Sequence, residues 1–131
     1  MINLDHAATT PLRPEALNAM LPYFTEYAAN ANALYAEGRR ARAAIDAARR
    51  QIADAIHAKP AEIYFTGSGS EADNWALFGA MRAMAEKSHI VTTQVEHHAI
   101  LNACAALEKL GYEVSYVPVD RQGCVDPEAI E

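Results

Sequence analysis

Apolar side chains recur along this chain with two different spacings. Between residues 38 and 56 they return every three or four positions, which predicts one face of a long helix; the positions are Ala41, Ile45, Ala48, Ile52 and Ile56. Opposite charges four residues apart on the same stretch (Arg42, Asp46, Arg50 and Asp54) predict a solvated face with ion pairs. An earlier helix is predicted from about residue 14 to 27, with Pro14 in its first turn and a kink or break at Pro22.

Short apolar runs alternate with helical patterns in the second half. Strands are predicted at Ile63–Thr66, His89–Thr93 and Glu113–Val119. The helices between them are expected to end near Lys87 and Leu110; the first is apolar around most of its circumference and should be buried. This order predicts an α/β fold with a parallel sheet covered by helices. Because another helix would begin near Asp126, after only three strands, we interpret the chain as the front of a longer protein.

Composition and charge narrow the class of protein. The 131 residues are 51% hydrophobic, enough for a core, and carry a net charge of −6. That balance argues against nucleic-acid and anionic-membrane partners. No apolar run approaches the ~20 residues of a membrane span, and the first residues lack the pattern of a secretory signal. Two cysteines are too few for a disulfide scaffold, so we expect a cytoplasmic location.

The segment GSGSEADN at residues 67–74 is the strongest candidate site. Glycines directly after a strand allow a tight turn, and the first turn of the next helix presents free N–H groups that suit a phosphate. The spacing of Ser68 and Glu71 predicts a capping box. From these residues alone, a capped turn without ligand fits equally well. The segment also fits a dinucleotide-binding pattern, but the next strand lacks the acidic residue at its end that this pattern requires.

The segment Glu96–His98 follows the second predicted strand, on the side where open α/β sheets bind ligands. No spacing supplies the further ligands of a metal site, so no metal is predicted. One imidazole could face the space above Gly69, although from these residues alone a plain surface pair is favoured. Cys104 and Cys124 have no cationic neighbour in sequence and are interpreted as ordinary thiols.

Five segments, in order, resemble the amino-terminal part of the NifS-like cysteine desulfurases, which belong to the fold-type I (class V aminotransferase) group of pyridoxal-phosphate enzymes. They are LDHAATTP at 4–11, GRRARAAIDAARRQIADAI at 38–56, EIYFTGSGSEADN at 62–74, TQVEHHAIL at 93–101 and GYEVSYVPVDRQGCVDPEAIE at 111–131. The resemblance implies part of a three-layer α/β/α large domain with a parallel sheet, preceded by an N-terminal helical segment. Residues 1–37 would form that segment, and residues 38–131 the first part of the cofactor-binding domain.

The resemblance also implies roles for particular residues. Gly69 and Ser70 would hold the phosphate of pyridoxal 5′-phosphate, and His97 would stack on its ring and help to move protons. The complete enzyme would release sulfur from L-cysteine, leaving L-alanine and an enzyme persulfide. It would be a homodimer that passes sulfur to an acceptor or scaffold protein, as in iron–sulfur cluster assembly.

Some family features are missing from the chain. Residues 30–35 replace a family Asn-Pro-Ser-Ser-His segment, and His6 replaces an asparagine. Lys59, Lys87 and Lys109 match no Schiff-base motif, and neither cysteine matches the persulfide position, so the chain alone is expected to be inactive. Two alternatives stay open: a selenocysteine lyase or other class V aminotransferase, and a non-catalytic binding or assembly domain.

Overall fold

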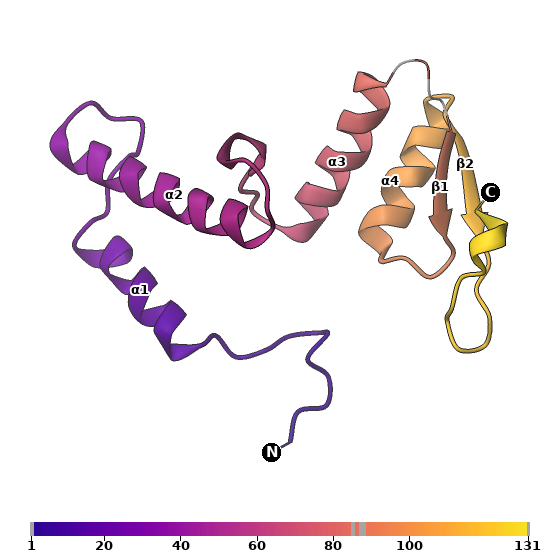
Figure 1. Cartoon of the computed structure of the whole chain (residues 1–131), viewed down its shortest axis with the longest axis horizontal. Helices are drawn as coiled ribbons and strands as arrows, with labels where there is room; N and C mark the ends of the chain where they lie inside the picture. The colour runs from indigo at the N-terminus through magenta and orange to yellow at the C-terminus, as the bar shows by residue number, and fades with distance from the viewer. Residues whose placement is uncertain (1, 85, 87–88, 131) are drawn as a thin grey trace. The chain divides into compact units, whose positions relative to one another are not determined.

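The structure is a computed structural model that describes residues 2–84, 86 and 89–130. Its contacts group the chain into two compact units, Met1–Tyr64 and Phe65–Glu131, whose elements are labelled in Figure 1. The domain boundary after residue 37 that the resemblance implies is a different boundary from the one between these two units, and it stays a prediction.

The first unit contains the helices α1 (Pro14–Thr25) and α2 (Ala36–Ala55) and a short 3₁₀ helix, η1 (Pro60–Glu62). Pro14 occupies the first position of α1, as predicted. The helix does not break at Pro22. Proline removes only its own N–H, and its carbonyl still accepts bonds from the amides of Glu26 (2.9 Å) and Tyr27 (2.8 Å).

The long helix α2 confirms the strongest helical pattern in the sequence. Asp46 forms ion pairs with Arg42 (3.6 Å) and Arg49 (2.8 Å) on its polar side. Gly38, Ala41 and Ala53 are buried, but the isoleucines of the predicted stripe are 39–62% exposed. The predicted apolar residues therefore lie on one face of the helix, but the largest of their side chains are exposed to solvent.

The second unit is a β–α–β arrangement preceded by a helix. It comprises α3 (Gly69–Ala83), β1 (His89–Thr93), α4 (His98–Lys109), β2 (Glu113–Val117) and a short 3₁₀ helix, η2 (Pro127–Ala129). The two strands are parallel, in a register that pairs His89 with Glu113 and Thr93 with Val117. The α/β class and the parallel pairing are thus confirmed.

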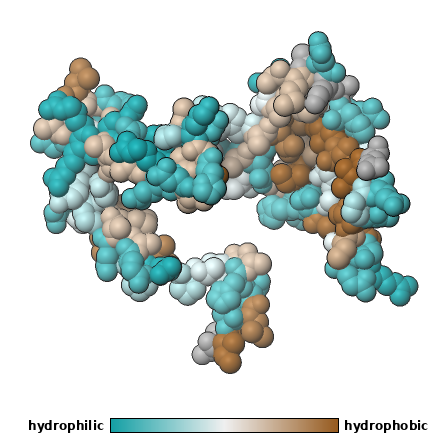
Figure 2. All heavy atoms as spheres, viewed as in Figure 1, coloured by the Kyte–Doolittle hydropathy of each residue, from teal (hydrophilic) through white to brown (hydrophobic). Residues whose placement is uncertain are grey.

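A small hydrophobic core joins these elements. Met81, Ile90, Cys104 and Leu107 are its buried members, and Figure 2 shows the hydrophobic residues of this unit gathered over α4 and β1. Only one side of α3 takes part, because Trp75 is 52% exposed. The prediction that α3 is buried around most of its circumference was wrong, and its predicted end at Lys87 lies outside the described residues.

The predicted strand at Ile63–Thr66 was also wrong, since those residues are not assigned to a strand. A strand needs a neighbour for its ladder of hydrogen bonds, and among the described residues the sheet consists of β1 and β2. The carbonyl of Ile63 instead accepts a bond from Arg49 Nε of α2 at 3.2 Å. A 3₁₀ turn, η2, begins after its N-cap Asp126, where the start of another helix was expected.

Candidate functional site at the start of α3 and α4

The helices α3 and α4 pack side by side and run in the same direction. Both begin at the edge of the unit where β1 and β2 end (Figure 1). The carboxyl edge of a parallel sheet is where open α/β folds bind their ligands. The topology therefore brings Gly69 and Ser70, in the first turn of α3, to the same end of the unit as His97, which precedes α4.

The turn into α3 is tied by its own side chains. The Ser68 hydroxyl oxygen accepts a bond from the Glu71 amide (3.2 Å), and the Glu71 carboxylate accepts one from the Gly67 amide (2.7 Å). Thr66 Oγ1 donates to the Ser68 carbonyl at 3.0 Å. The cap predicted from the spacing of Ser68 and Glu71 is confirmed, with the carboxylate reaching the amide one residue before Ser68.

Gly69 and Ser70 offer donors to an anion. Within the described part of the chain, neither backbone amide donates a hydrogen bond, as is typical of a first helical turn. A Cβ built on Gly69 would have no atom within 4 Å, so the space beside this backbone is open. The exposed Ser70 hydroxyl adds a third donor at the same place.

Asn74, the last residue of the segment GSGSEADN, has a role in this site that the motif alone did not assign. Its side-chain amide donates to the Ser70 carbonyl at 2.8 Å, which holds the first turn of α3 from the side opposite its free N–H groups. Residues four apart lie next to each other on a helix, so the spacing of Ser70 and Asn74 could have revealed this contact.

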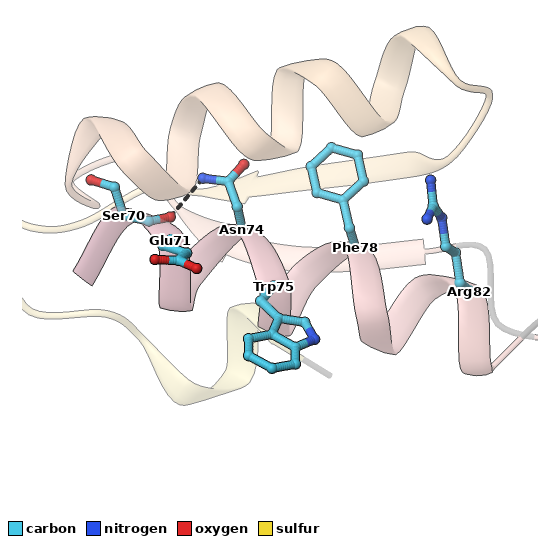
Figure 3. A pocket seen from close by; sticks show the side chains of 6 residues that line it. All are labelled: Ser70, Glu71, Asn74, Trp75, Phe78 and Arg82. Carbon is cyan, nitrogen blue, oxygen red and sulfur yellow. Dashed lines mark hydrogen bonds between the residues drawn. The ribbon is translucent and has the colours of Figure 1, made fainter. Parts of the chain in front are cut away.

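A shallow groove runs from this turn along α3, and Figure 3 shows the side chains that line it. All of them belong to α3: Ser70, Glu71, Asn74, Trp75, Phe78 and Arg82. Ser70, Asn74, Phe78 and Arg82 follow one another at four-residue intervals along one side of the helix (Figure 3). The groove is thus formed by one helix, and His97 does not line it.

His97 is the N-cap of α4. Its ring nitrogen Nδ1 accepts a hydrogen bond from the Ala99 amide at 3.1 Å, and its side chain is exposed. The ring of His98 lies 6.3 Å away, centroid to centroid. Glu96 is held separately, because its Oε1 accepts a bond from the Thr93 hydroxyl at 3.0 Å. The side chains of Glu96 and His97 are thus held by different partners, Thr93 and Ala99.

The two thiols differ in their environment. Cys104 is fully buried in the core, whereas Cys124 is exposed, and both are free. Burial raises the pKa of Cys104, and the negative charges of Glu108 and Glu96 raise it further. A thiol held in its protonated form is a poor nucleophile, which agrees with the interpretation of Cys104 as an ordinary thiol.

Among residues 2–84, 86 and 89–130, no cluster of three or more His, Cys, Asp or Glu side chains could hold a metal ion. No helix among the same residues has both the length and the apolar content that a membrane span requires.

The residues at the start of α3 fit the phosphate of pyridoxal 5′-phosphate. Two unengaged amides, a hydroxyl and an open space beside a glycine are what a bound phosphate needs at a helix N-terminus. The fit has an electrostatic cost, since the Glu71 carboxylate lies in the same turn. Its bond to the Gly67 amide partly offsets that cost by drawing charge toward a donor.

Comparison with known proteins gives one consistent family. The Aminotransferase class-V family matches residues 2–131. The chain is 47% identical over 130 residues to a cysteine desulfurase IscS of Methanosarcina thermophila. This alignment covers 98% of this chain and 32% of that protein. It is 49% identical over 131 residues to a cysteine desulfurase IscS of Dictyoglomus turgidum, in an alignment that covers 99% of this chain and 33% of that protein.

Solved structures agree. A NifS-like protein matches with a TM-score of 0.90 at 33% identity, over 96% of this chain and 35% of its own length. The structure of SspA in complex with cysteine matches with a TM-score of 0.83 at 38% identity, over 91% of this chain and 35% of its own. The chain spans about a third of the length of these relatives. It belongs to the class V aminotransferase family, and its relatives within that family are cysteine desulfurases of the IscS/NifS type.

Proposed function

We propose that this chain forms the part of a pyridoxal-phosphate-dependent cysteine desulfurase that holds the cofactor phosphate and ring. The observation that carries the proposal is the identity of 45–49% to several cysteine desulfurases across nearly all of the chain. The chain spans about a third of the length of those proteins, so we propose their activity for the complete enzyme of which this chain would be a part.

The phosphate would lie against the first turn of α3. The amides of Gly69 and Ser70 would each donate one hydrogen bond, and the Ser70 hydroxyl a third. The helix dipole adds only ~0.3–1 kcal/mol, whereas each hydrogen bond to a charged group contributes ~1.5–3 kcal/mol. Binding would therefore depend mainly on these three donors and on the side-chain bonds that hold the turn.

His97 would lie over the cofactor ring from the start of α4. When bound, pyridoxal phosphate supplies the electron sink for bond cleavage at the amino acid, while the protein orients the reactants. We propose L-cysteine as the substrate, with L-alanine and an enzyme persulfide as products. In support, a structural relative at 38% identity has been solved in complex with cysteine. A homodimer, a sulfur acceptor and a cytoplasmic location are further parts of this proposal.

We also propose that these 131 residues do not turn over cysteine on their own. Lys59 immediately precedes the proline that begins η1, Lys109 ends α4, and the Cys104 thiol is buried. None of these matches the family's Schiff-base lysine or persulfide cysteine. Release of alanine and sulfide by the purified chain with added cofactor would contradict this part of the proposal.

Calorimetric titration of the chain with pyridoxamine 5′-phosphate tests cofactor binding. This form has no aldehyde, so it cannot react with surface lysines. We expect it to bind more tightly than pyridoxamine, which lacks the phosphate, and we expect Ser70→Ala to remove much of that difference. Equal affinity for the two compounds would contradict the proposed role of Gly69 and Ser70.

A further inference from the structure

A short loop joins the end of β1 to the start of α4 (Figure 1). On the sheet side, the Gln94 amide donates to the Val117 carbonyl at 3.1 Å, so the pairing of the strands continues one residue past β1. On the helix side, the carbonyl of His97 accepts a bond from the Leu101 amide at 3.2 Å. Residues 95 and 96 lie between these two fixed points, and their conformation decides where His97 is held.

One side-chain bond closes this loop. The Thr93 hydroxyl donates to Glu96 Oε1 at 3.0 Å, from the last residue of β1 to the residue before His97. Both residues are half-buried, whereas His97 is exposed. The charge of Glu96 also contributes to the raised pKa of the buried Cys104 thiol, so the carboxylate lies close enough to the core to act on it. A hydrogen bond to a charged acceptor is stronger than one between neutral groups, so this bond closes the loop firmly.

We infer that Thr93 and Glu96 are positioning residues, which hold His97 where it can lie over the cofactor ring. The inference rests on the proposed function for the identity of the ligand. Neither side chain needs to touch that ligand, because the bond between them acts through the backbone of the loop. A loop that is fixed before binding loses less conformational entropy when the ligand arrives. A misplacement of about 1 Å is enough to weaken a contact of this kind.

The two contacts proposed for the cofactor would respond differently to loss of this bond. The phosphate would bind Gly69 and Ser70 at the start of α3, where the turn is held by its own bonds to Ser68 and Glu71. The ring would contact His97, whose position depends on the loop. Removal of the bond should therefore weaken the binding of the ring and leave the binding of phosphate as it is.

Glu108 provides a matched control. Its carboxylate accepts a bond from the Tyr116 phenol at 3.1 Å, which ties α4 to β2. Like Glu96, it contributes to the raised pKa of Cys104. Glu108→Ala thus removes a carboxylate with a hydroxyl partner from the same unit, and it leaves the loop before His97 unchanged.

Titration of the ¹⁵N-labelled chain with pyridoxamine 5′-phosphate and, separately, with inorganic phosphate tests the inference by nuclear magnetic resonance. We expect Glu96→Ala and Thr93→Val to weaken binding of pyridoxamine 5′-phosphate about five- to tenfold, as for the loss of one hydrogen bond, and to bind inorganic phosphate as the unmutated chain does. Glu96→Gln keeps an acceptor and Thr93→Ser keeps a donor, so both should recover most of the affinity. Glu108→Ala should bind both compounds normally. Equal weakening for both compounds, or no weakening for pyridoxamine 5′-phosphate, would overturn the inference.

Order parameters from ¹⁵N relaxation of the free chain give a readout that needs no ligand. The amides of Glu96 and His97 should have values of about 0.85, typical of a rigid backbone, in the unmutated chain and in Glu108→Ala. In Thr93→Val they should fall below about 0.6; valine suits a strand, so we expect β1 to form in this variant. The same values in all three chains would overturn the inference. Order parameters that change as expected, in a chain that binds neither compound, would support the positioning of His97 and contradict the proposed function.

Discussion

The Glu71 carboxylate accepts a hydrogen bond from the Gly67 amide at 2.7 Å, across the turn that leads into α3. The amide of Glu71 donates in turn to the Ser68 hydroxyl oxygen. The turn is therefore held by bonds in both directions before any ligand arrives. A site that is already ordered loses less conformational entropy on binding. For this reason a short and exposed loop can bind a phosphate.

The first prediction concerns Glu71 itself. Glu71→Ala removes the acceptor for the Gly67 amide and should lower the free energy of unfolding by about 1 kcal/mol. Glu71→Gln keeps an acceptor oxygen but removes the negative charge, so we expect it to bind inorganic phosphate more tightly than the unmutated chain. Urea unfolding and phosphate titration check the two effects. Weaker phosphate binding by Glu71→Gln would contradict the account of the charge.

Ser68 and Ser70 are a matched pair with different tasks. Ser68 caps α3, so Ser68→Ala should lower the free energy of unfolding by about 1 kcal/mol. The Ser70 hydroxyl makes no bond within the described residues, so Ser70→Ala should leave stability nearly unchanged. It should weaken binding of pyridoxamine 5′-phosphate about tenfold or more, since a hydrogen bond to a charged group is lost. The opposite pattern would contradict the assignment of roles.

Gly111 and Gly79 are predicted to respond oppositely to alanine. Gly111 follows α4 with φ +93°, and its amide donates to the Glu108 carbonyl at 2.9 Å. Gly111→Ala should destabilise the chain by about 1 kcal/mol, because alanine disfavours this conformation. Gly79 lies inside α3, and an added Cβ would only touch Trp75 at 3.7 Å. Gly79→Ala should stabilise by about 0.5–1 kcal/mol, as urea unfolding of both variants would show.

Accessibility should separate the two cysteines. Iodoacetamide should modify the exposed Cys124 in the folded chain and reach Cys104, which has no exposed surface, only after unfolding. Mass spectrometry before and after addition of denaturant measures this. Rapid labelling of Cys104 in the folded chain would show that the core around Met81, Ile90 and Leu107 is not formed.

Cys104 also predicts how stability depends on pH. Burial, with help from Glu108 and Glu96, raises the pKa of its thiol above the ordinary value of 9.0. Above that pH the unfolded chain loses this proton and the folded chain keeps it, so the folded state binds more protons and stability falls as pH rises. The contribution is fully present below pH 9.0 and is lost as the pH passes through the folded pKa.

Burial raises the pKa of the Tyr116 phenol, and the hydrogen bond from this phenol to Glu108 raises it further. Tyr116 therefore adds to the decline of stability at higher pH. We therefore expect the free energy of unfolding to decrease from pH 9 upward, and the decrease to be smaller in Cys104→Ala. Comparison of the slopes cancels the constant cost of removing the side chain. A slope unaffected by Cys104→Ala would contradict this assignment.

Local patterns were sufficient to predict the helices and the paired strands. The bounds of β1 match the predicted His89–Thr93, and α4 begins at the predicted His98. These elements depend on periodic apolar positions and on caps, which are read from neighbouring residues. The order of strand, helix and strand then predicted the parallel pairing.

Features that depend on distant partners could not be predicted in this way. Ile63–Thr66 has the composition of a strand, but pairing requires a neighbour, and the Ile63 carbonyl binds Arg49 instead. The exposure of Trp75 on α3 likewise depends on what packs against that helix. At the site, the cap of α3 followed from the spacing of Ser68 and Glu71, whereas the capping role of His97 depends on a bond to Ala99 that its residue type does not suggest.

The central claim is that the first turn of α3 holds the phosphate of a vitamin B6 coenzyme. Amide chemical shifts of the ¹⁵N-labelled chain, followed during titration with pyridoxamine 5′-phosphate and in parallel with pyridoxamine, test it most directly. We predict that the Gly69 and Ser70 amides shift in a saturable manner with the phosphorylated compound and stay unchanged with the other. Unchanged Gly69 and Ser70 amides in both titrations, or equal shifts in both, would contradict the claim.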